Sequence, residues 1–397
     1  MAHCLVTGGS KGVEGEWGDL DPRGSPDLTL AKKKDQGNYE CEVLGEGSEG
    51  AVQWKKCTKN PGHLNFIPAP KFSLDHLPGE YRDEELLEFV RVVSDRTVKL
   101  TVGYTSTNRP DGFIFSNFRG TSIPHTGTGF LYCYNYGDEP QLNVSDVSQD
   151  ESDEDDDPVK NSETDSKDEI EEDEDDFQII EQFDLRLDRC PCPECTNSDD
   201  PKRSWGYVYA HTAKHVVYDD SEAKRTVVTL NYNDPDCSEG VKTLYGDAVT
   251  WEDGDRDWCN MTCVTHDRDV YQSLYSKERD REEQHTDINE KFWRCKTPLA
   301  IIVSHPHGCA KQITVGQWTN RTVKFDNQES GDQMTEYTYD TPTCSGTSGA
   351  PVVLLGEKGV GRETWWYPHY HTHSGTFDGK LNISGTSDES KVELDDQ

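Results

Sequence analysis

From Gly127 onward, short strand-like runs alternate with turns along the chain. The runs combine β-branched and aromatic residues, as in GYVYAHTAKHVV, RTVVTLNY, PLAIIVSH, KQITVGQW, MTEYTYD and APVVLL. Turn-forming residues separate them, and helical periodicity is almost absent. Many short strands at close spacing favour a β-sandwich or a β-barrel over a fold built on helices.

The first quarter of the 397 residues has a different pattern. Residues 1–80 are polar and rich in Gly and Lys, so we expect them to be loosely ordered. Asp83 to Val93 predicts a short helix with one apolar face, and the alternation that begins at Val98 predicts a strand. We therefore predict an N-terminal region over residues 1–111, in which a flexible leader precedes a small α+β part.

Negative charge is concentrated in one segment. The net charge is −36, and the stretch from Asp146 to Asp176 contains 18 acidic and 2 basic residues. A segment with so much charge and so little apolar content cannot bury a core, so we predict a disordered acidic insert over residues 137–188. The overall charge argues against nucleic acid or a membrane surface as a partner.

The sequence also bears on the compartment. No apolar run is long enough for a transmembrane helix, and the start MAHCLVTGGSKG lacks the hydrophobic region of a secretory signal. The 13 cysteines form an odd, irregularly spaced set, which favours free thiols. We expect a cytoplasmic protein, or a secreted one if this N-terminus is incomplete.

One glycine-rich turn has the composition of a nucleophile loop. The stretch GTSGAP at residues 346–351 places Ser348 between two glycines. Glycine permits backbone conformations that a Cβ forbids, and it lets a substrate approach the serine. The amides of Gly346 and Ser348 could then both point at a developing oxyanion. Such turns are common, so the interpretation requires a base elsewhere in the chain.

Candidate partners for the serine lie upstream. His215 follows the strand-like run GYVYAH, where a half-buried imidazole has a tunable charge state. Asp269, directly before the apolar Val270, could orient the imidazole, and Asp267 is the alternative. A lone histidine or aspartate is weak evidence, so the order of the three groups carries the interpretation.

That order resembles the chymotrypsin-like (trypsin-fold) serine peptidases. Thr-Ala-Lys-His, then Asp-Val, then Gly-Thr-Ser-Gly-Ala-Pro follow one another, with 54 and 79 residues separating His, Asp and Ser. The run GTGFLY at residues 127–132 is similar to the first-strand signature of the intracellular and bacterial-type members. HPHG at residues 305–308, followed by QITVG, is similar to the start of the second domain's hairpin. The resemblance covers residues 112–390 and leaves 391–397 as a tail.

The resemblance implies an all-β fold of two antiparallel six-stranded β-barrels with the active site in the cleft between them. It implies His215 as general base, Asp269 as its orienting acid and Ser348 as nucleophile, with Gly346 and Ser348 supplying the oxyanion-hole amides. The substrate would be a protein or peptide. A catalytically silent binding module on the same fold, and an esterase with the same triad, are the alternatives.

Two departures from the digestive enzymes point toward the bacterial-type branch of this family. Val216 stands where extracellular members have a disulfide-forming cysteine, and Thr347 where trypsins have an aspartate that pairs with a new N-terminus. We therefore expect no trypsin-like activation through such a pairing.

The resemblance also implies a substrate preference. Thr343, five residues before the nucleophile, and His373 on the strand after it resemble the pocket of the glutamyl endopeptidases and the picornaviral main proteases. A hydroxyl and an imidazole can both donate to a carboxylate or an amide oxygen. The interpretation is a preference for Glu or Gln before the cleaved bond. His371 competes with His373 for this role, and both histidines could instead be solvent-facing.

No cofactor is required by this chemistry. Cys192 and Cys195 have zinc-ligand spacing, and Cys259 with Cys263 could supply a second pair for a structural zinc ion. Free thiols, or a disulfide between the two pairs, are the simpler interpretations. The oligomeric state is not indicated by the sequence.

Overall fold

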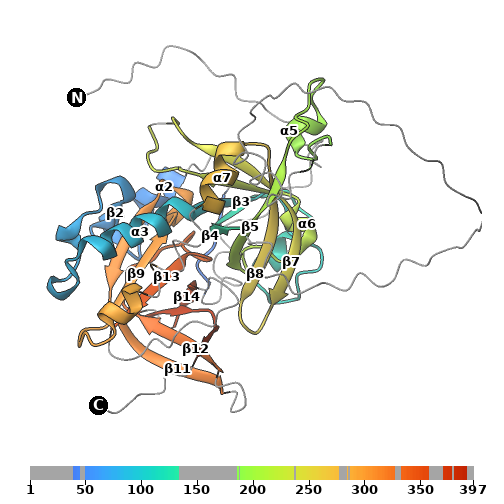
Figure 1. Cartoon of the computed structure of the whole chain (residues 1–397). Coiled ribbons are helices and arrows are strands. Elements are labelled where there is room, and N and C mark those ends of the chain that lie inside the picture. The colour runs from blue at the N-terminus through green and yellow to red at the C-terminus, as the bar shows by residue number, and fades with distance from the viewer. Residues whose placement is uncertain are drawn as a thin grey trace, which may run out of the picture.

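The computed structural model describes residues 39–44, 50–133, 186, 188–236, 238–276, 284, 287–326, 332–356, 370–377 and 380–390. Strands dominate this part of the chain and form two antiparallel sheets that lie side by side (Figure 1). The predicted insert at 137–188 lies outside the described residues except for 186 and 188, and so does the predicted tail at 391–397.

The first sheet closes into a barrel. Its six strands are β3 (Thr97–Val102), β4 (His125–Tyr132), β5 (Gly206–Ala213), β6 (Thr226–Leu230), β7 (Lys242–Asp253) and β8 (Trp258–Thr265). They pair in the order β4-β3-β6-β7-β8-β5, and β5 returns to β4. The short β1 (Glu42–Val43) adds to the barrel by pairing with β4.

The second sheet follows in the chain. Its strands are β9 (Leu299–Ser304), β10 (Gln312–Gly316), β11 (Trp318–Asp326), β12 (Asp332–Tyr339), β13 (Pro351–Leu355), β14 (His371–Thr376), β15 (Asn382–Ser384) and β16 (Ser387–Ser390), joined by the early β2 (Ile67–Pro68). The pairing order is β11-β12-β15-β14-β13-β9-β10-β2, and β16 pairs with β12. The predicted all-β fold is confirmed: a closed six-stranded antiparallel barrel lies beside a second antiparallel sheet, which has nine strands and does not close through the pairings of the described residues.

Helices are short and lie around the sheets. The α-helices are α2 (Gly50–Lys56), α3 (Glu84–Arg96), α5 (Pro193–Thr196), α6 (Asp220–Ala223) and α7 (Arg268–Ser276). The 3-10 turns are η1 (Pro61–His63), η2 (Ala69–Lys71), η3 (Leu74–His76), η4 (Gly79–Tyr81), η5 (Ser116–Phe118) and η6 (Pro306–Gly308). In the described part of the chain, no helix is long and apolar enough to span a membrane.

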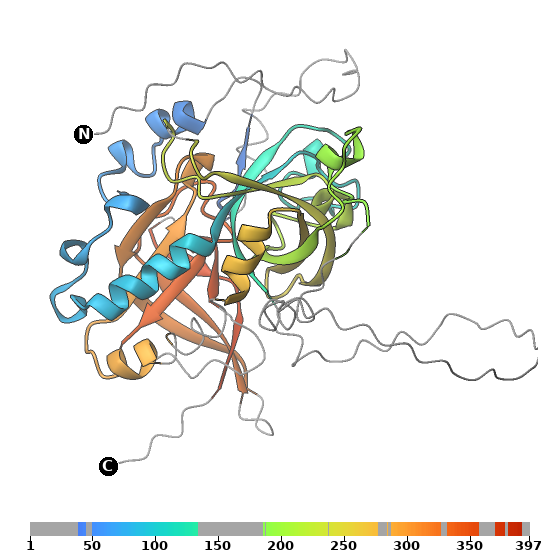
Figure 2. The ribbon, with the colours of Figure 1, turned by 45° about the horizontal axis from the view of Figure 1, so that its top comes forward.

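Helix α3 confirms the predicted helix: Asp83 is its N-cap, and it ends at Arg96 rather than at the predicted Val93. The Asp83 carboxylate accepts hydrogen bonds from the amides of Glu85 and Leu86, at 3.0 and 3.2 Å, and so caps the N-terminus. Its apolar face, including Val90, is buried against the second sheet, in one cluster with residues of β9, β10 and β13. Figure 2 shows this helix lying across the second sheet.

The N-terminal region is not a separate unit. Strand β3 pairs with both β4 and β6, so the barrel begins at Thr97 and the boundary predicted at residue 112 is too late. Residues 50–80, predicted to be loosely ordered, contain α2 and the turns η1 to η4. Their packing against β10 and η6 could not be read from a polar sequence.

Thr128 links the two sheets through both its backbone and its side chain. Thr128 of β4 donates its amide hydrogen to the carbonyl of Ser348 at 2.8 Å, and its hydroxyl to the carbonyl of Gly346 at 2.8 Å. The same hydroxyl accepts a hydrogen bond from the amide of His305 at 3.0 Å. The GTGFLY run therefore fixes the Ser348 turn to the first barrel.

Candidate active site

The Ser348 turn has the conformation that its glycines allow. It connects β12 to β13, and Gly346 and Gly349 have positive φ angles of 93° and 87°. A Cβ on Gly349 would lie 2.1 Å from the carbonyl oxygen of Thr128, so this position accepts only glycine. Ser348 itself is fully buried.

His215 is held by an aspartate. Its Nδ1 lies 2.7 and 2.9 Å from the two carboxylate oxygens of Asp257, and its amide donates to the same carboxylate at 3.1 Å. The hydroxyl of Ser374 donates to Asp257 at 2.6 Å. Burial disfavours the charged imidazolium, but the Asp257 carboxylate and the Cys41 thiol beside the ring outweigh this effect and raise the pKa of His215 to about 9. The carboxylate thus holds Nδ1 and fixes the orientation of the ring.

The predicted acid, Asp269, does not take this place. It lies in the first turn of α7, and its amide donates to the carboxylate of Asp267. Asp267 accepts from the amide of Val270 as well and forms an ion pair with Lys242. The Asp-Val pattern in the sequence is therefore part of a helix start, and neither predicted acid orients His215.

Asp257 was missed because its local sequence gives no signal. It sits in the turn between β7 and β8, within the acidic run WEDGDRDW, with a left-handed φ of 56°. Only the hairpin that brings β7 and β8 back beside β5 places it against His215. The local sequence indicates only a tight turn, in which an aspartate is common, and not a contact with His215.

A buried ion pair anchors the main chain of His215. The guanidinium of Arg109 contacts the carboxylate of Glu222 at 2.6 and 2.7 Å, and both side chains are fully buried. The same guanidinium donates to the carbonyl oxygen of His215 at 3.1 and 3.2 Å. The orientation of the histidine therefore depends on this pair.

Ser348 and His215 belong to the same site but are not hydrogen-bonded. Ser374 contacts Asp257 through its hydroxyl and accepts the Ser348 hydroxyl through its carbonyl, at 3.0 Å. The Ser348 hydroxyl also accepts from the amide of Glu40 at 3.0 Å. Nε2 of His215 is buried and has no hydrogen-bond partner among the described residues.

Two amides of the Ser348 turn converge on one carbonyl oxygen. The amides of Gly346 and Ser348 both point at the carbonyl oxygen of Glu40, at 2.5 and 3.4 Å. These are the two amides predicted from the sequence. Because they converge on one carbonyl, the backbone of the turn needs no rearrangement to stabilise a tetrahedral oxyanion.

The side chain of Glu40 lies in a pocket built for a carboxylate. One oxygen lies 2.8 Å from Nε2 of His373, and the other forms an ion pair with Lys59. Nζ of Lys59 also donates to the hydroxyl of Thr343 at 2.9 Å and to Asn382 at 2.8 Å. Burial would raise the pKa of Glu40, but the His373 hydrogen bond and the Lys59 charge lower it to about 2. The pocket therefore holds an ionised carboxylate.

The tautomer of His373 suits this contact. Burial lowers the pKa of His373, so the ring is neutral and has one proton to place. The hydroxyl of Tyr339 lies 2.7 Å from Nδ1. With that hydroxyl donating, the proton sits on Nε2 and is donated to the carboxylate of Glu40.

Of the two predicted pocket residues, His373 contacts the Glu40 carboxylate directly, and Thr343 accepts from Lys59, which pairs with the same carboxylate. His371, the competing histidine, lies near Ser384 and the ring of Tyr337 in the second sheet instead. Both histidines are buried rather than facing solvent. Lys59 was missed, since nothing in its polar N-terminal segment indicates a pocket residue.

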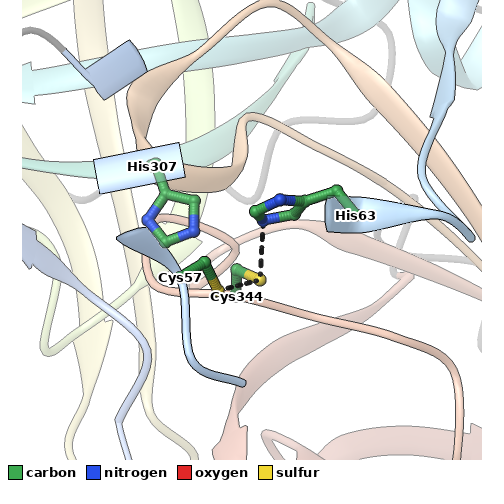
Figure 3. Close-up of side chains that lie close together, drawn as sticks. All are labelled: Cys57, His63, His307 and Cys344. Carbon is green, nitrogen blue, oxygen red and sulfur yellow. Dashed lines mark hydrogen bonds between the residues drawn. The ribbon is translucent and has the colours of Figure 1, made fainter. Parts of the chain in front are cut away.

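Two cysteine–histidine clusters have the geometry of metal sites. In the first, the side chains of Cys57, His63, His307 and Cys344 point toward one another (Figure 3), with all four ligand atoms within 4.8 Å. Sγ of Cys344 lies 3.5 Å from Sγ of Cys57 and 3.4 Å from Nε2 of His63. The cluster joins the segment after α2, η1, η6 and the loop before Ser348.

The second cluster consists of Cys190, Cys192, Cys195 and His266. Each of its three sulfur atoms lies 3.7 Å from Nδ1 of His266. The predicted pair Cys192 and Cys195 is therefore brought together, but with different partners. Cys259 and Cys263, the other predicted pair, are buried in the core of the first barrel on β8.

Three solved structures are similar to the chain. These are the Rv3671c protease from M. tuberculosis in its active form (12% identity, 77% of this chain and 82% of that chain, TM-score 0.32), its inactive form (12%, 77% and 90%, 0.31) and Deg5 (12%, 78% and 91%, 0.33). No family model matches the chain, and no curated protein does.

Proposed function

We propose that the chain is a serine endopeptidase that cleaves after glutamate. The observation that carries the proposal is the position of Glu40. Its carbonyl oxygen accepts from the amides of Gly346 and Ser348, while its carboxylate contacts His373 and Lys59. One residue thus occupies the oxyanion hole and the side-chain pocket at once, as the residue before a cleaved bond must.

The chemistry follows from the residues around that carbonyl. Nε2 of His215 takes the proton of the Ser348 hydroxyl while Oγ attacks the carbonyl carbon, and then gives it to the leaving amine. Asp257 keeps the other ring proton on Nδ1 and stabilises the imidazolium. The amides of Gly346 and Ser348 stabilise the oxyanion, a contribution of about 3–4 kcal/mol for one such donor. Water activated by the same histidine releases the acyl group.

Selectivity for glutamate follows from charge. When the pocket holds an apolar side chain, the buried His373 loses the acceptor for its hydrogen bond, and the ammonium of Lys59, whose side chain is about one third exposed, loses its ion pair. A lysine or arginine would bring a second cation beside Lys59. Glutamine keeps the hydrogen bond from His373 but loses the ion pair, so it should be accepted less well than glutamate.

The test uses peptides that differ only in the residue before the cleaved bond. We expect cleavage after Glu to exceed cleavage after Lys or Phe by about 10–100-fold in kcat/KM, the scale of one buried donor, His373, left without its acceptor. Ser348→Ala should abolish turnover, and His373→Leu should lower kcat/KM for Glu while leaving the weak Phe activity unchanged. His76→Leu, at an exposed histidine, is the matched control.

Three results would count against the proposal. Equal cleavage of all peptides would refute the glutamate pocket. Hydrolysis of esters without any peptide cleavage would favour an esterase. A folded wild-type chain without either activity would favour the binding module, an alternative that the rotation of Ser348 away from His215 keeps open.

A further inference from the structure

A segment of the chain itself lies in the active site as a substrate would. Tyr39 pairs in antiparallel fashion with Gly375, and its ring stacks on that of His215 at 4.1 Å between centroids. Glu40 follows in the pocket, and Cys41 is fully buried beyond it. The next two residues form β1 and extend the barrel beside β4.

The direction and register match those of a cleavable peptide. The acyl side of the Glu40–Cys41 bond is in the oxyanion hole, and the amide of Glu40 contacts the nucleophile itself. Backbone pairing on both sides of this bond, at Gly375 and at β4, holds the peptide extended across the site. Glu42 adds a contact to His307 at 2.5 Å beyond the bond.

We propose that the chain cleaves its own Glu40–Cys41 peptide bond in cis; this rests on the function proposed above. Oγ of Ser348 adds to the carbonyl carbon of Glu40, and its proton passes through His215 to the nitrogen of Cys41, which leaves as a free amine. A water molecule then hydrolyses the ester, which regenerates Ser348 and leaves a carboxylate at Glu40.

One movement precedes the reaction. The Ser348 hydroxyl must turn from the carbonyl of Ser374 toward Nε2 of His215, a rotation about a single side-chain bond. Until the bond is cut, Glu40 fills the pocket and excludes other substrates. Cleavage breaks the covalent link between Glu40 and β1, so that residues 1–40 can dissociate and another peptide can enter the site.

The experiment follows the intact mass of the full chain during expression and incubation. We expect the wild type to yield a fragment of residues 1–40 and a product that begins at Cys41, at a rate that does not change over a 100-fold range of protein concentration. Ser348→Ala and Glu40→Lys should stay uncut. Glu88→Lys, the same change at an exposed site on α3, should be cut like the wild type.

The outcomes distinguish self-cleavage at the Glu40–Cys41 bond from the serine endopeptidase activity proposed above. A wild type that cleaves Glu peptides in trans but keeps its Glu40–Cys41 bond would refute self-cleavage and leave the endopeptidase intact. Cutting at another bond, or cutting whose rate scales with concentration, would overturn the cis reaction at this site. A folded chain with neither reaction would overturn both proposals.

A second inference rests on the cysteine–histidine clusters. Zn²⁺ binds sulfur at about 2.3 Å and histidine nitrogen at about 2.0–2.1 Å in a tetrahedron, so its ligand atoms lie roughly 3.4–3.8 Å apart. The separations of 3.4 and 3.5 Å around Cys344, and of 3.7 Å around His266, fall in this range. We propose that each cluster binds one zinc ion, as Cys₂His₂ and Cys₃His sites.

The surroundings of the first cluster support a bound cation. The carboxylate of Glu42 accepts from Nδ1 of His307, which leaves Nε2 for a metal, and Nε2 is buried without a hydrogen-bond partner in the described residues. The amide of Asn60 donates to Sγ of Cys57 at 3.4 Å, and its side chain to Sγ of Cys344 at 3.2 Å. Such donors stabilise thiolates.

This zinc ion would also organise the glutamate pocket. Lys59 lies two residues after one ligand, Cys57, and Thr343 directly before another, Cys344. The side chain of Asn60 ties the two segments together through the carbonyl of Thr343 at 2.8 Å. A metal at this position fixes the N-terminal segment that supplies Lys59 to the loop that supplies the nucleophile.

Metal content of the full chain, purified without chelator, tests the second inference. We expect two zinc ions per chain, and one in each of two double variants, Cys57→Ser with Cys344→Ser and Cys192→Ser with Cys195→Ser. Cys295→Ser with Cys309→Ser, outside both clusters, should keep two. If a variant fails to fold, Co²⁺ exchanged into the wild type should show the absorption of two tetrahedral thiolate sites. A chain without zinc, or one with a Cys57–Cys344 disulfide, would overturn the proposal.

Discussion

Replacing Asp257 by asparagine tests the acid of the proposed triad. The carboxylate contacts Nδ1 of His215 at 2.7 and 2.9 Å and, together with the Cys41 thiol, raises the pKa of that ring from its ordinary 6.5 to about 9, against the effect of burial. That difference corresponds to about 3 kcal/mol of stabilisation of the imidazolium, or about 10²-fold in rate. An asparagine also lets the ring adopt the wrong tautomer, and the two effects together give a loss on the order of 10⁴-fold in kcat.

The pH dependence of kcat/KM shows in which direction Asp257 shifts the pKa of His215. His215 acts as a base only when neutral, so wild-type kcat/KM should rise with pH through a limb well above 6.5, toward 9. In Asp257→Asn the largest contribution that raises the pKa of His215 is lost, while burial still lowers it, so the limb should move to a lower pH than in the wild type. The assay is hydrolysis of a Glu peptide between pH 5 and 10. Asp269→Asn, the matched change at the acid that the sequence favoured, should leave rate and limb unchanged. The reasoning fails if Asp257→Asn keeps more than a tenth of the activity, or if both variants lose it equally.

Two further predictions concern the scaffold. Arg109→Met should lower the free energy of unfolding, measured in urea, by about 3–5 kcal/mol, because Glu222 is left as an unpaired buried charge. The double variant Arg109→Met with Glu222→Met should recover part of this loss of stability. If the losses of the two single variants simply add in the double variant, Arg109 and Glu222 are not energetically coupled. Gly349→Ala should unfold at a clearly lower temperature than the wild type. A Cβ at this position would lie 2.1 Å from the carbonyl oxygen of Thr128, and the residue has a positive φ angle. A variant as stable as the wild type would show that the turn adjusts.

The sequence predicted the features that depend on residues close together in the chain. Alternating apolar residues and turn signals predicted a β fold, and Asp83 predicted the start of α3. The glycines around Ser348 predicted a turn whose amides converge on one oxygen, because their conformational freedom is a property of the residue type itself. The strand-end position of His215 likewise followed from its neighbours.

The features that the sequence did not predict depend on contacts between distant segments. Asp257 reaches His215 only because the β7–β8 hairpin folds back beside β5. Lys59 enters the glutamate pocket from a polar segment that packs on the second sheet. His266 completes a cysteine cluster that lies 71 residues from it at its nearest member, Cys195. Helix capping explains the misleading Asp-Val pair: it forms the first turn of α7, whose amides donate to the carboxylate of Asp267.

The central claim is that Ser348 is a nucleophile activated by His215 beside a formed oxyanion hole. A fluorophosphonate probe tests it most directly, since only an activated serine reacts with it. After incubation of the full chain with the probe and digestion, mass spectrometry should find one adduct, on Ser348, which Ser348→Ala lacks entirely and His215→Ala reduces by at least about 10²-fold. An adduct on another residue, or labelling of Ser348 that does not depend on His215, would contradict the account.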